Sequence, residues 1–149
     1  MSYNEDTLCG LFHMRALESG DSRPFLMGRF DGSGDPVSDF RTISWGEARM
    51  LSLELASGLM ALGVKRGDRV LIYMPMVAQA CFAILASARI GAIHSVVFGG
   101  FASGSLATRI DDAKPTLIVS SDAGMRGGKA VPYKHLLDEA IDLAESKPA

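Results

Sequence analysis

The sequence predicts an α/β fold in which a mostly parallel sheet carries helices on its faces. Three short apolar segments rich in strand-forming residues occur at 69–74, 92–98 and 116–120. Segments with the length and composition of helices, 77–90 and 103–113, lie between them. Strands joined through helices need right-handed crossovers, which make neighbouring strands parallel. Because ligands of such sheets bind at the carboxyl ends of the strands, the loops that follow the strands are the first candidates for a site.

Two further helices are predicted on either side of this alternation. Ser44-Trp45-Gly46-Glu47 matches a capping box, and leucines recur at three- and four-residue steps behind it up to Gly63. A helix is therefore expected at about 45–62. The segment Lys134–Ser146 is amphipathic and is expected to form the last helix of the chain.

The N-terminal region is expected to be peripheral. Turn-forming residues flank the short apolar run Phe25–Met27, a pattern that indicates a hairpin or two edge strands. We therefore divide the chain into residues 1–43, an extension with a loop and short edge strands, and residues 44–149, an α/β portion.

Composition excludes several classes of function. The formal net charge is −2 and the 15 Lys and Arg residues are scattered, so no nucleic-acid partner is expected. No apolar run approaches the ~18 residues of a membrane span, and the acidic start is unlike a signal peptide, so no membrane partner is expected. Cys9 and Cys81 fit neither a metal site nor a disulfide framework. These features indicate a cytoplasmic protein, or one of the mitochondrial matrix if the gene is eukaryotic.

A glycine-rich basic loop is the strongest candidate for a binding site. It follows the third predicted strand and contains Gly124, Arg126, Gly127, Gly128 and Lys129. Glycines allow a ligand to approach the backbone closely, and two positive charges three residues apart suit a phosphate group. The alternative is a mobile turn whose basic side chains are only solvated, and the loop alone does not decide between the two.

A second candidate is Gly99-Gly100, which lies between a predicted strand and a predicted helix. Such a pair could present backbone amides to an anion at the start of the helix. The chain contains no G-x-G-x-x-G and no Gly-Lys-Ser/Thr. The missing dinucleotide fingerprint argues against a nucleotide-binding oxidoreductase domain.

Two long segments, Gly67–Met76 and Ala88–Phe101, resemble the acetyl- and propionyl-CoA synthetases. Further segments, Leu106–Pro115 and Val131–Lys134 followed by Leu137–Ala140, are closer to the propionyl-CoA branch. The resemblance covers about residues 41–148. It implies that residues 44–149 are the incomplete N-terminal portion of the large domain of an AMP-dependent, adenylate-forming synthetase.

The resemblance also implies a reaction and a set of binding residues. In this family a carboxylate attacks ATP, accompanied by Mg²⁺, to give an acyl-adenylate, and the CoA thiol then displaces AMP. The residues whose positions match the family's CoA site are Phe98, Gly99, Gly100, Arg126, Gly127, Gly128 and Lys129. The small-molecule partner implied for this chain is therefore CoA, held in a partial site.

The sequence departs from the family pattern at several points. Leu11–Arg15 stands where the family has its opening Asn-containing and Asp-Arg-His signature, and Ala78-Gln79 replaces a Pro-Glu pair. The family's ATP-binding and catalytic motifs have no match in the 149 residues. No catalytic residue and no metal ligand is therefore assigned, and the sites for ATP and Mg²⁺ are expected to lie outside this chain.

These observations favour a fragment of a propionate–CoA or acetate–CoA ligase that is inactive by itself. The alternative is a non-catalytic module that binds CoA or a partner, or a truncated remnant of the enzyme. A sheet that stops before its remaining strands should expose an apolar edge and face, so self-association is also expected.

Overall fold

The computed structural model of the chain describes residues 7–29, 40–126 and 129–148. Its helices and strands, in chain order, are α1 (Leu8–Ser19), β1 (Pro24–Arg29), β2 (Phe40–Ser44), α2 (Trp45–Ala61), β3 (Arg69–Tyr73), α3 (Ala78–Ile90), β4 (Ile93–Val97), α4 (Ser103–Ala113), β5 (Leu117–Ser120), β6 (Gly124–Arg126), β7 (Lys129–Val131) and α5 (Tyr133–Leu143).

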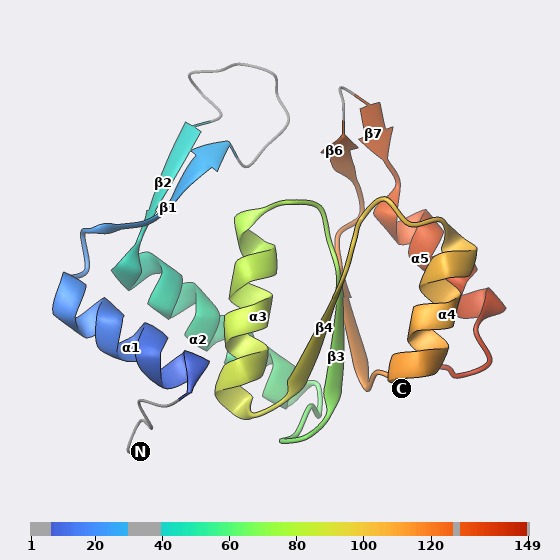
Figure 1. Cartoon of the computed structure of the whole chain (residues 1–149), viewed down its shortest axis with the longest axis horizontal. Coiled ribbons are helices and arrows are strands. Elements are labelled where there is room, and N and C mark those ends of the chain that lie inside the picture. The colour runs from blue at the N-terminus through green and yellow to red at the C-terminus, as the bar shows by residue number, and fades with distance from the viewer. Residues whose placement is uncertain (1–6, 30–39, 127–128, 149) are drawn as a thin grey trace.

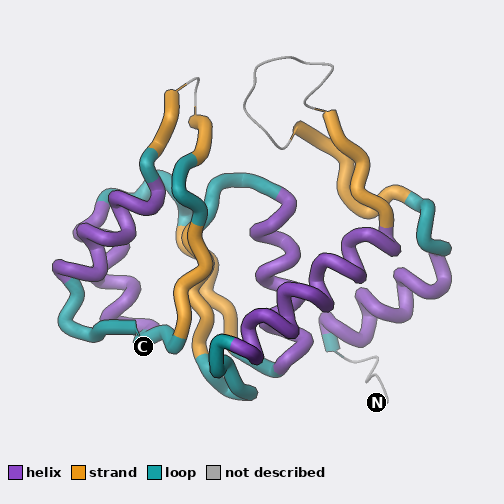
Figure 2. The backbone as a smooth tube through the Cα atoms, turned by 180° about the vertical axis from the view of Figure 1, so that it is seen from behind, coloured by secondary structure: helices purple, strands orange, loops and turns teal. Residues whose placement is uncertain are grey.

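The central sheet confirms the predicted α/β fold. Its strand order is β4-β3-β5, and both pairings are parallel, with Tyr73 aligned to Val97 on one side and to Ser120 on the other. Helices α2 and α3 lie on one side of the sheet and α4 and α5 on the other (Figure 1). The same layers are seen from behind in Figure 2, with two antiparallel hairpins, β1–β2 and β6–β7, extending from one end of the molecule.

Strand β3 is buried on both faces. Leu71 and Tyr73 pack into the cluster formed with α4 and α5, whereas Val70 and Ile72 pack against α2 and α3. All four side chains are fully buried, at 0% exposure. Helices on both faces explain why this segment is an uninterrupted apolar run rather than an alternating one.

Helix ends are fixed by specific hydrogen bonds. The Ser44 hydroxyl accepts a hydrogen bond of 3.1 Å from the amide of Glu47, which is the N-cap half of the predicted capping box. At the end of α4, the guanidinium of Arg69 donates to the carbonyls of Ala113 (3.1 Å) and Lys114 (2.8 Å). Arg69 therefore joins the start of β3 to the end of α4, where its charge also complements the helix dipole.

The last helix ends earlier than the sequence suggests. We expected it to continue to Ser146, but α5 ends at Leu143 and the next residue is extended. The Lys147 ammonium donates to the carbonyls of Ile141 and Asp142, and the amide of Ser146 donates to Asp111 at 2.7 Å. The bonds from Lys147 satisfy two carbonyls near the helix end, and the bond to Asp111 joins the segment after α5 to α4.

Strand β4 lies at an edge of the sheet and is the least covered of the three strands. Of its side chains, only Val97 is buried. Ile93 is 58% exposed, Val96 is 56% exposed, and Phe98, which directly follows the strand, is 60% exposed. Among the described residues β4 pairs only with β3, so it presents an open edge with apolar side chains.

The N-terminal region contains a helix that the sequence analysis did not predict. Helix α1 begins after Thr7, whose hydroxyl accepts a hydrogen bond of 3.0 Å from the amide of Gly10. Phe12 of α1 packs against Phe25 of β1 and Trp45 of α2, with ring centroids 5.3 and 5.4 Å away. The predicted pair of short strands is present as the antiparallel β1–β2 hairpin.

His13 of α1 is buried among cationic neighbours. Its side chain is 9% exposed. Burial lowers the pKa of its imidazole, and the nearby Arg89 and Arg49 lower this pKa further. Because both effects disfavour the protonated ring, the folded protein prefers neutral His13.

We predict that His13 makes the protein less stable in mild acid. Because the pKa of His13 is lower in the folded protein, its imidazole is protonated at a higher pH in the unfolded chain than in the folded one. As the pH falls through about 6.5, the unfolded state therefore gains this proton first and becomes relatively more stable. The stabilisation present above that pH is then progressively lost. Urea unfolding between pH 5 and pH 8 should show a smaller pH dependence in His13→Gln than in the native chain. A pH dependence in His13→Gln equal to that of the native chain would contradict this account.

Candidate functional site

The carboxyl ends of the parallel strands bring together the segments in which the sequence placed the site. Phe98–Phe101 follows β4, and the paired strands β6 (Gly124–Arg126) and β7 (Lys129–Val131) follow β5. This hairpin extends from the end of the sheet at which the strands terminate (Figure 1). Tyr133 at the start of α5 lies against both segments, at Gly99 and at Gly124, and Pro75 after β3 lies against Gly124.

The glycine-rich basic loop forms an antiparallel hairpin in which Arg126 aligns with Lys129. Both side chains are exposed. Directly opposed residues in an antiparallel pair are close enough for both charges to act on one ligand. Gly127 and Gly128, which the sequence also assigned to the site, lie outside the described residues.

Arg126 lies over the ring of Phe98. Its guanidinium carbon is 5.0 Å from the ring centroid, within the range of a cation–π interaction. The Phe98 ring also meets Phe101 edge to face, with centroids 6.0 Å apart. The structure thus brings Arg126, from the hairpin after β5, to Phe98, from the segment after β4.

The two glycines of this segment leave space that neighbouring side chains occupy. A Cβ atom on Gly99 would lie 2.0 Å from the hydroxyl oxygen of Tyr133, and one on Gly100 would lie 2.2 Å from Nη1 of Arg126. Neither glycine has a positive φ. The spaces left by their missing side chains are therefore filled by Tyr133 and Arg126.

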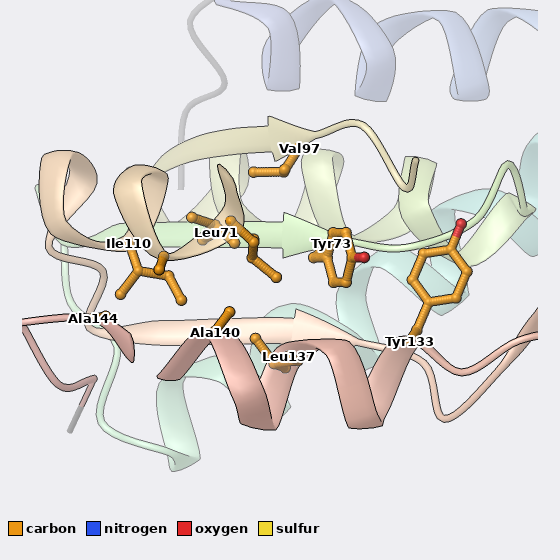
Figure 3. Packing of buried hydrophobic residues seen from close by; sticks show 10 residues of the cluster. Leu71, Tyr73, Val97, Ile110, Tyr133, Leu137, Ala140 and Ala144 are labelled. Carbon is orange, nitrogen blue, oxygen red and sulfur yellow. The ribbon is translucent and has the colours of Figure 1, made fainter. Parts of the chain in front are cut away.

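Tyr133 was not singled out from the sequence. Its ring is 3% exposed and lies 5.0 Å, centroid to centroid, from that of Tyr73. Figure 3 shows Tyr133 just past the end of β3, beyond Tyr73. The spacing of Tyr133, Leu137, Ala140 and Ala144 predicts a buried helix face, but no local pattern indicates that Tyr133 contacts Gly99.

The tyrosine pair is kept neutral by its surroundings. Burial raises the pKa of Tyr133, and Arg126 acts in the opposite direction on this pKa. Burial likewise raises the pKa of Tyr73, with a further contribution from Tyr133. The hydroxyl of Tyr73 donates to the carbonyl of Phe101 at 3.3 Å, which joins the end of β3 to the segment after β4.

The site can bind an anion beside an aromatic ring. Two cations, Arg126 and Lys129, are aligned across the β6–β7 pair, and Phe98 beside them is 60% exposed. A shallow groove that shares Phe101 with this site is lined by Phe101, Ser105, Thr108, Arg109 and Asp112. Arg109 and Asp112 carry opposite charges, so this groove does not favour an anion in the same way.

Two other features, a cluster of metal ligands and a membrane-spanning helix, do not occur in residues 7–29, 40–126 and 129–148. These ranges contain no group of three or more His, Cys, Asp or Glu side chains that could hold a metal ion. No helix within the same ranges is long and apolar enough to cross a membrane.

Comparisons with known proteins agree on the kind of enzyme that the chain resembles. The family model described as AMP-binding enzyme matches residues 18–148. The chain is similar to the propionate–CoA ligase of Escherichia coli (strain K12), with 70% identity over 94 residues, covering 63% of this chain and 15% of that protein. It is also similar to an acetyl-coenzyme A synthetase of Shewanella baltica (strain OS195), with 52% identity over 108 residues, covering 72% of this chain and 17% of the relative. The chain thus spans only about a sixth of the length of these relatives.

We predict that Gly99→Ala is markedly more destabilising than a glycine substitution elsewhere in the same region. The added methyl group would overlap the Tyr133 hydroxyl, and relieving that overlap should cost about 1–3 kcal/mol of unfolding free energy. Gly104 in α4 has open space around it, with no atom within 4 Å of the place that a Cβ atom would take. Gly104→Ala should therefore be neutral or stabilising by up to about 1 kcal/mol. Urea unfolding of the two variants measures both effects, and equal stability would contradict the close contact with Tyr133.

Proposed function

The chain belongs to the AMP-binding enzyme family, and we propose that it supplies part of the CoA site of a propionate–CoA or acetate–CoA ligase. In the proposed reaction, ATP and the carboxylate form an acyl-adenylate and pyrophosphate, and the CoA thiol then displaces AMP. The higher identity to the propionate–CoA ligase, 70% against 52%, favours propionate as the substrate.

The observation that carries the proposal is the position of Arg126 over Phe98 and against Gly100. A guanidinium group offers paired N–H donors that match phosphate oxygens, and Lys129 across the hairpin adds a second positive charge. The exposed ring of Phe98 gives an apolar surface on which a nucleotide base can stack. Together these groups suit the phosphorylated nucleotide end of CoA.

The proposed role of this chain is binding rather than bond making. Arg126 and Lys129 would hold the 3′-phosphate of CoA, and Phe98, Gly99 and Gly100 would form the surface beside it. ATP and Mg²⁺ belong to the proposed reaction of the longer relatives, and we assign no step involving them to residues of this chain. We also propose that the 149-residue chain alone does not complete the reaction.

A non-catalytic CoA-binding module is the alternative. It is favoured by one observation, namely that Arg126, Phe98 and Tyr133 are already held together within the described residues. Both functions require CoA binding, and they differ in whether propionate and ATP are turned over. A cytoplasmic location remains a prediction from the sequence.

We predict that the chain binds CoA and that the 3′-phosphate contributes to the affinity. Isothermal titration calorimetry of the native chain with CoA should show binding, and dephospho-CoA should bind more weakly by roughly tenfold, as expected for loss of a charged hydrogen-bonded contact. The double variant Arg126→Ala/Lys129→Ala should weaken CoA binding by at least that factor and remove the preference for CoA over dephospho-CoA.

The control for this titration is Arg15→Ala. Arg15 lies on the exposed surface of α1, where it pairs with Glu18 at 3.2 Å, so its loss changes the net charge without touching the loop. Arg15→Ala should bind CoA as the native chain does. Absence of CoA binding by a folded native chain would refute a CoA site in this chain.

We also propose that the chain self-associates through β4. The edge of this strand and the exposed side chains of Ile93, Val96 and Phe98 combine free backbone groups with apolar surface. Pairing of such an edge with a second copy would satisfy the backbone groups and remove this apolar surface from water.

We predict that a charge on β4 weakens this association. In sedimentation velocity over a range of concentrations, Val96→Lys should shift the chain toward the monomer, because a lysine at an edge strand resists pairing. Leu143→Lys places the same charge on a side chain that is 64% exposed at the end of α5 and should not change the distribution. A native chain that stays monomeric at all concentrations would refute the proposed self-association.

A further inference from the structure

We propose that Tyr133 is a positioning residue for the phosphate-binding part of the site. This inference rests on the proposed CoA site and assigns its shape to a buried side chain outside the glycine-rich loop. Tyr133 holds the β6–β7 hairpin against Gly99, and in this way it places Arg126 where a phosphate group can be bound.

The position of Tyr133 in the chain couples it to the hairpin. It is separated from the end of β7, at Val131, by Pro132 alone, and it is the first residue of α5. The ring is 3% exposed and packs in the same cluster as Leu71 and Leu137. One end of the hairpin is therefore fixed to the hydrophobic core through this ring.

The ring of Tyr133 also meets the segments that follow the neighbouring strands. It lies 5.0 Å from the ring of Tyr73 at the end of β3. Its hydroxyl occupies the space beside Gly99, where a Cβ atom would be only 2.0 Å away. Tyr133 therefore lies between the end of β3 and the segment after β4.

The other end of the hairpin is held by the same side chain. A Cβ atom on Gly124, the first residue of β6, would lie 3.1 Å from Cε2 of Tyr133 and 2.9 Å from Pro75. Both strands of the hairpin thus converge on one ring. Arg126 is two residues beyond Gly124, so its backbone position depends on how this end is packed.

The side chain of Arg126 is exposed. The position of its backbone must therefore be held by contacts that other residues make. Its guanidinium carbon lies 5.0 Å from the centroid of the Phe98 ring, and its Nη1 occupies the space where a side chain of Gly100 would begin. A long exposed side chain loses conformational freedom when it binds a ligand, and a site that is held in place beforehand lowers this cost. The packing of Tyr133 supplies that rigidity at the base of the hairpin.

Two substitutions separate the contributions of the ring and of the hydroxyl. Tyr133→Phe keeps the ring between Tyr73, Gly99 and Gly124, and we expect it to retain CoA affinity. Tyr133→Leu removes the ring contacts and leaves an apolar side chain, so the hairpin should no longer be fixed. Leu137→Ala is the matched control, since Leu137 lies one turn along α5, is 6% exposed, and packs in the same cluster.

The test compares CoA with dephospho-CoA in calorimetric titrations of the full 149-residue chain. Tyr133→Leu should weaken CoA binding about tenfold and remove the preference for CoA over dephospho-CoA, as loss of one charged contact would. Leu137→Ala and Tyr133→Phe should keep that preference. If Tyr133→Leu keeps the preference, or weakens both ligands equally, Tyr133 does not act through the phosphate contact and the inference is wrong.

A second measurement tests the positioning without any ligand. Gly99→Ala should lower the Tm in the native background, and the drop should be much smaller in the Tyr133→Leu background, because the overlapping atoms are gone. Additive shifts in Tm would overturn the inference. If the native chain does not bind CoA, the proposed function fails, whereas this cycle still decides whether Tyr133 holds Gly99 in place.

Discussion

The complete burial of β3 is the constraint on which the rest of the structure depends. Val70, Leu71, Ile72 and Tyr73 are at 0% exposure, so both faces of this strand must be covered. Helices α2 and α3 cover one face, and α4 and α5 cover the other. The crossovers through α3 and α4 make β4 and β5 parallel to β3, so the segments that follow all three strands meet at the carboxyl end of the sheet.

The hydrophobic core and the candidate site are continuous with each other. Tyr73 ends the buried strand, and its hydroxyl donates to the carbonyl of Phe101, while its own carbonyl accepts a hydrogen bond of 2.9 Å from Ser120. Its ring then meets Tyr133, which in turn contacts Gly99. The packing at the end of β3 is therefore continuous with the residues around Arg126.

The sequence predicted what depends on local pattern and missed what depends on distant contacts. The bounds of α4 and the N-cap at Ser44 follow from nearby residues, and both were predicted. Helix α1 is the exception. Thr7, the spacing of Phe12, His13 and Ala16, and Gly20 indicate it locally, but Gly10 in its first turn weakens the pattern. In the site, the charges of Arg126 and Lys129 are evident from the sequence itself, whereas the contact of Tyr133 with Gly99 joins residues 34 positions apart and has no local signature.

The strand order β4-β3-β5 has a consequence for folding kinetics. The strand that lies at the centre of the sheet is the first of the three along the chain. Its neighbour β4 follows after one helix, and its neighbour β5 follows only after two helices and β4. During synthesis on the ribosome, this largely apolar segment emerges before either pairing partner exists. Pairings of this kind form late and slowly, since the intervening chain must be closed first. The nascent chain therefore passes through a stage in which its most deeply buried strand is unprotected, and it is at this stage that a chaperone would be needed most.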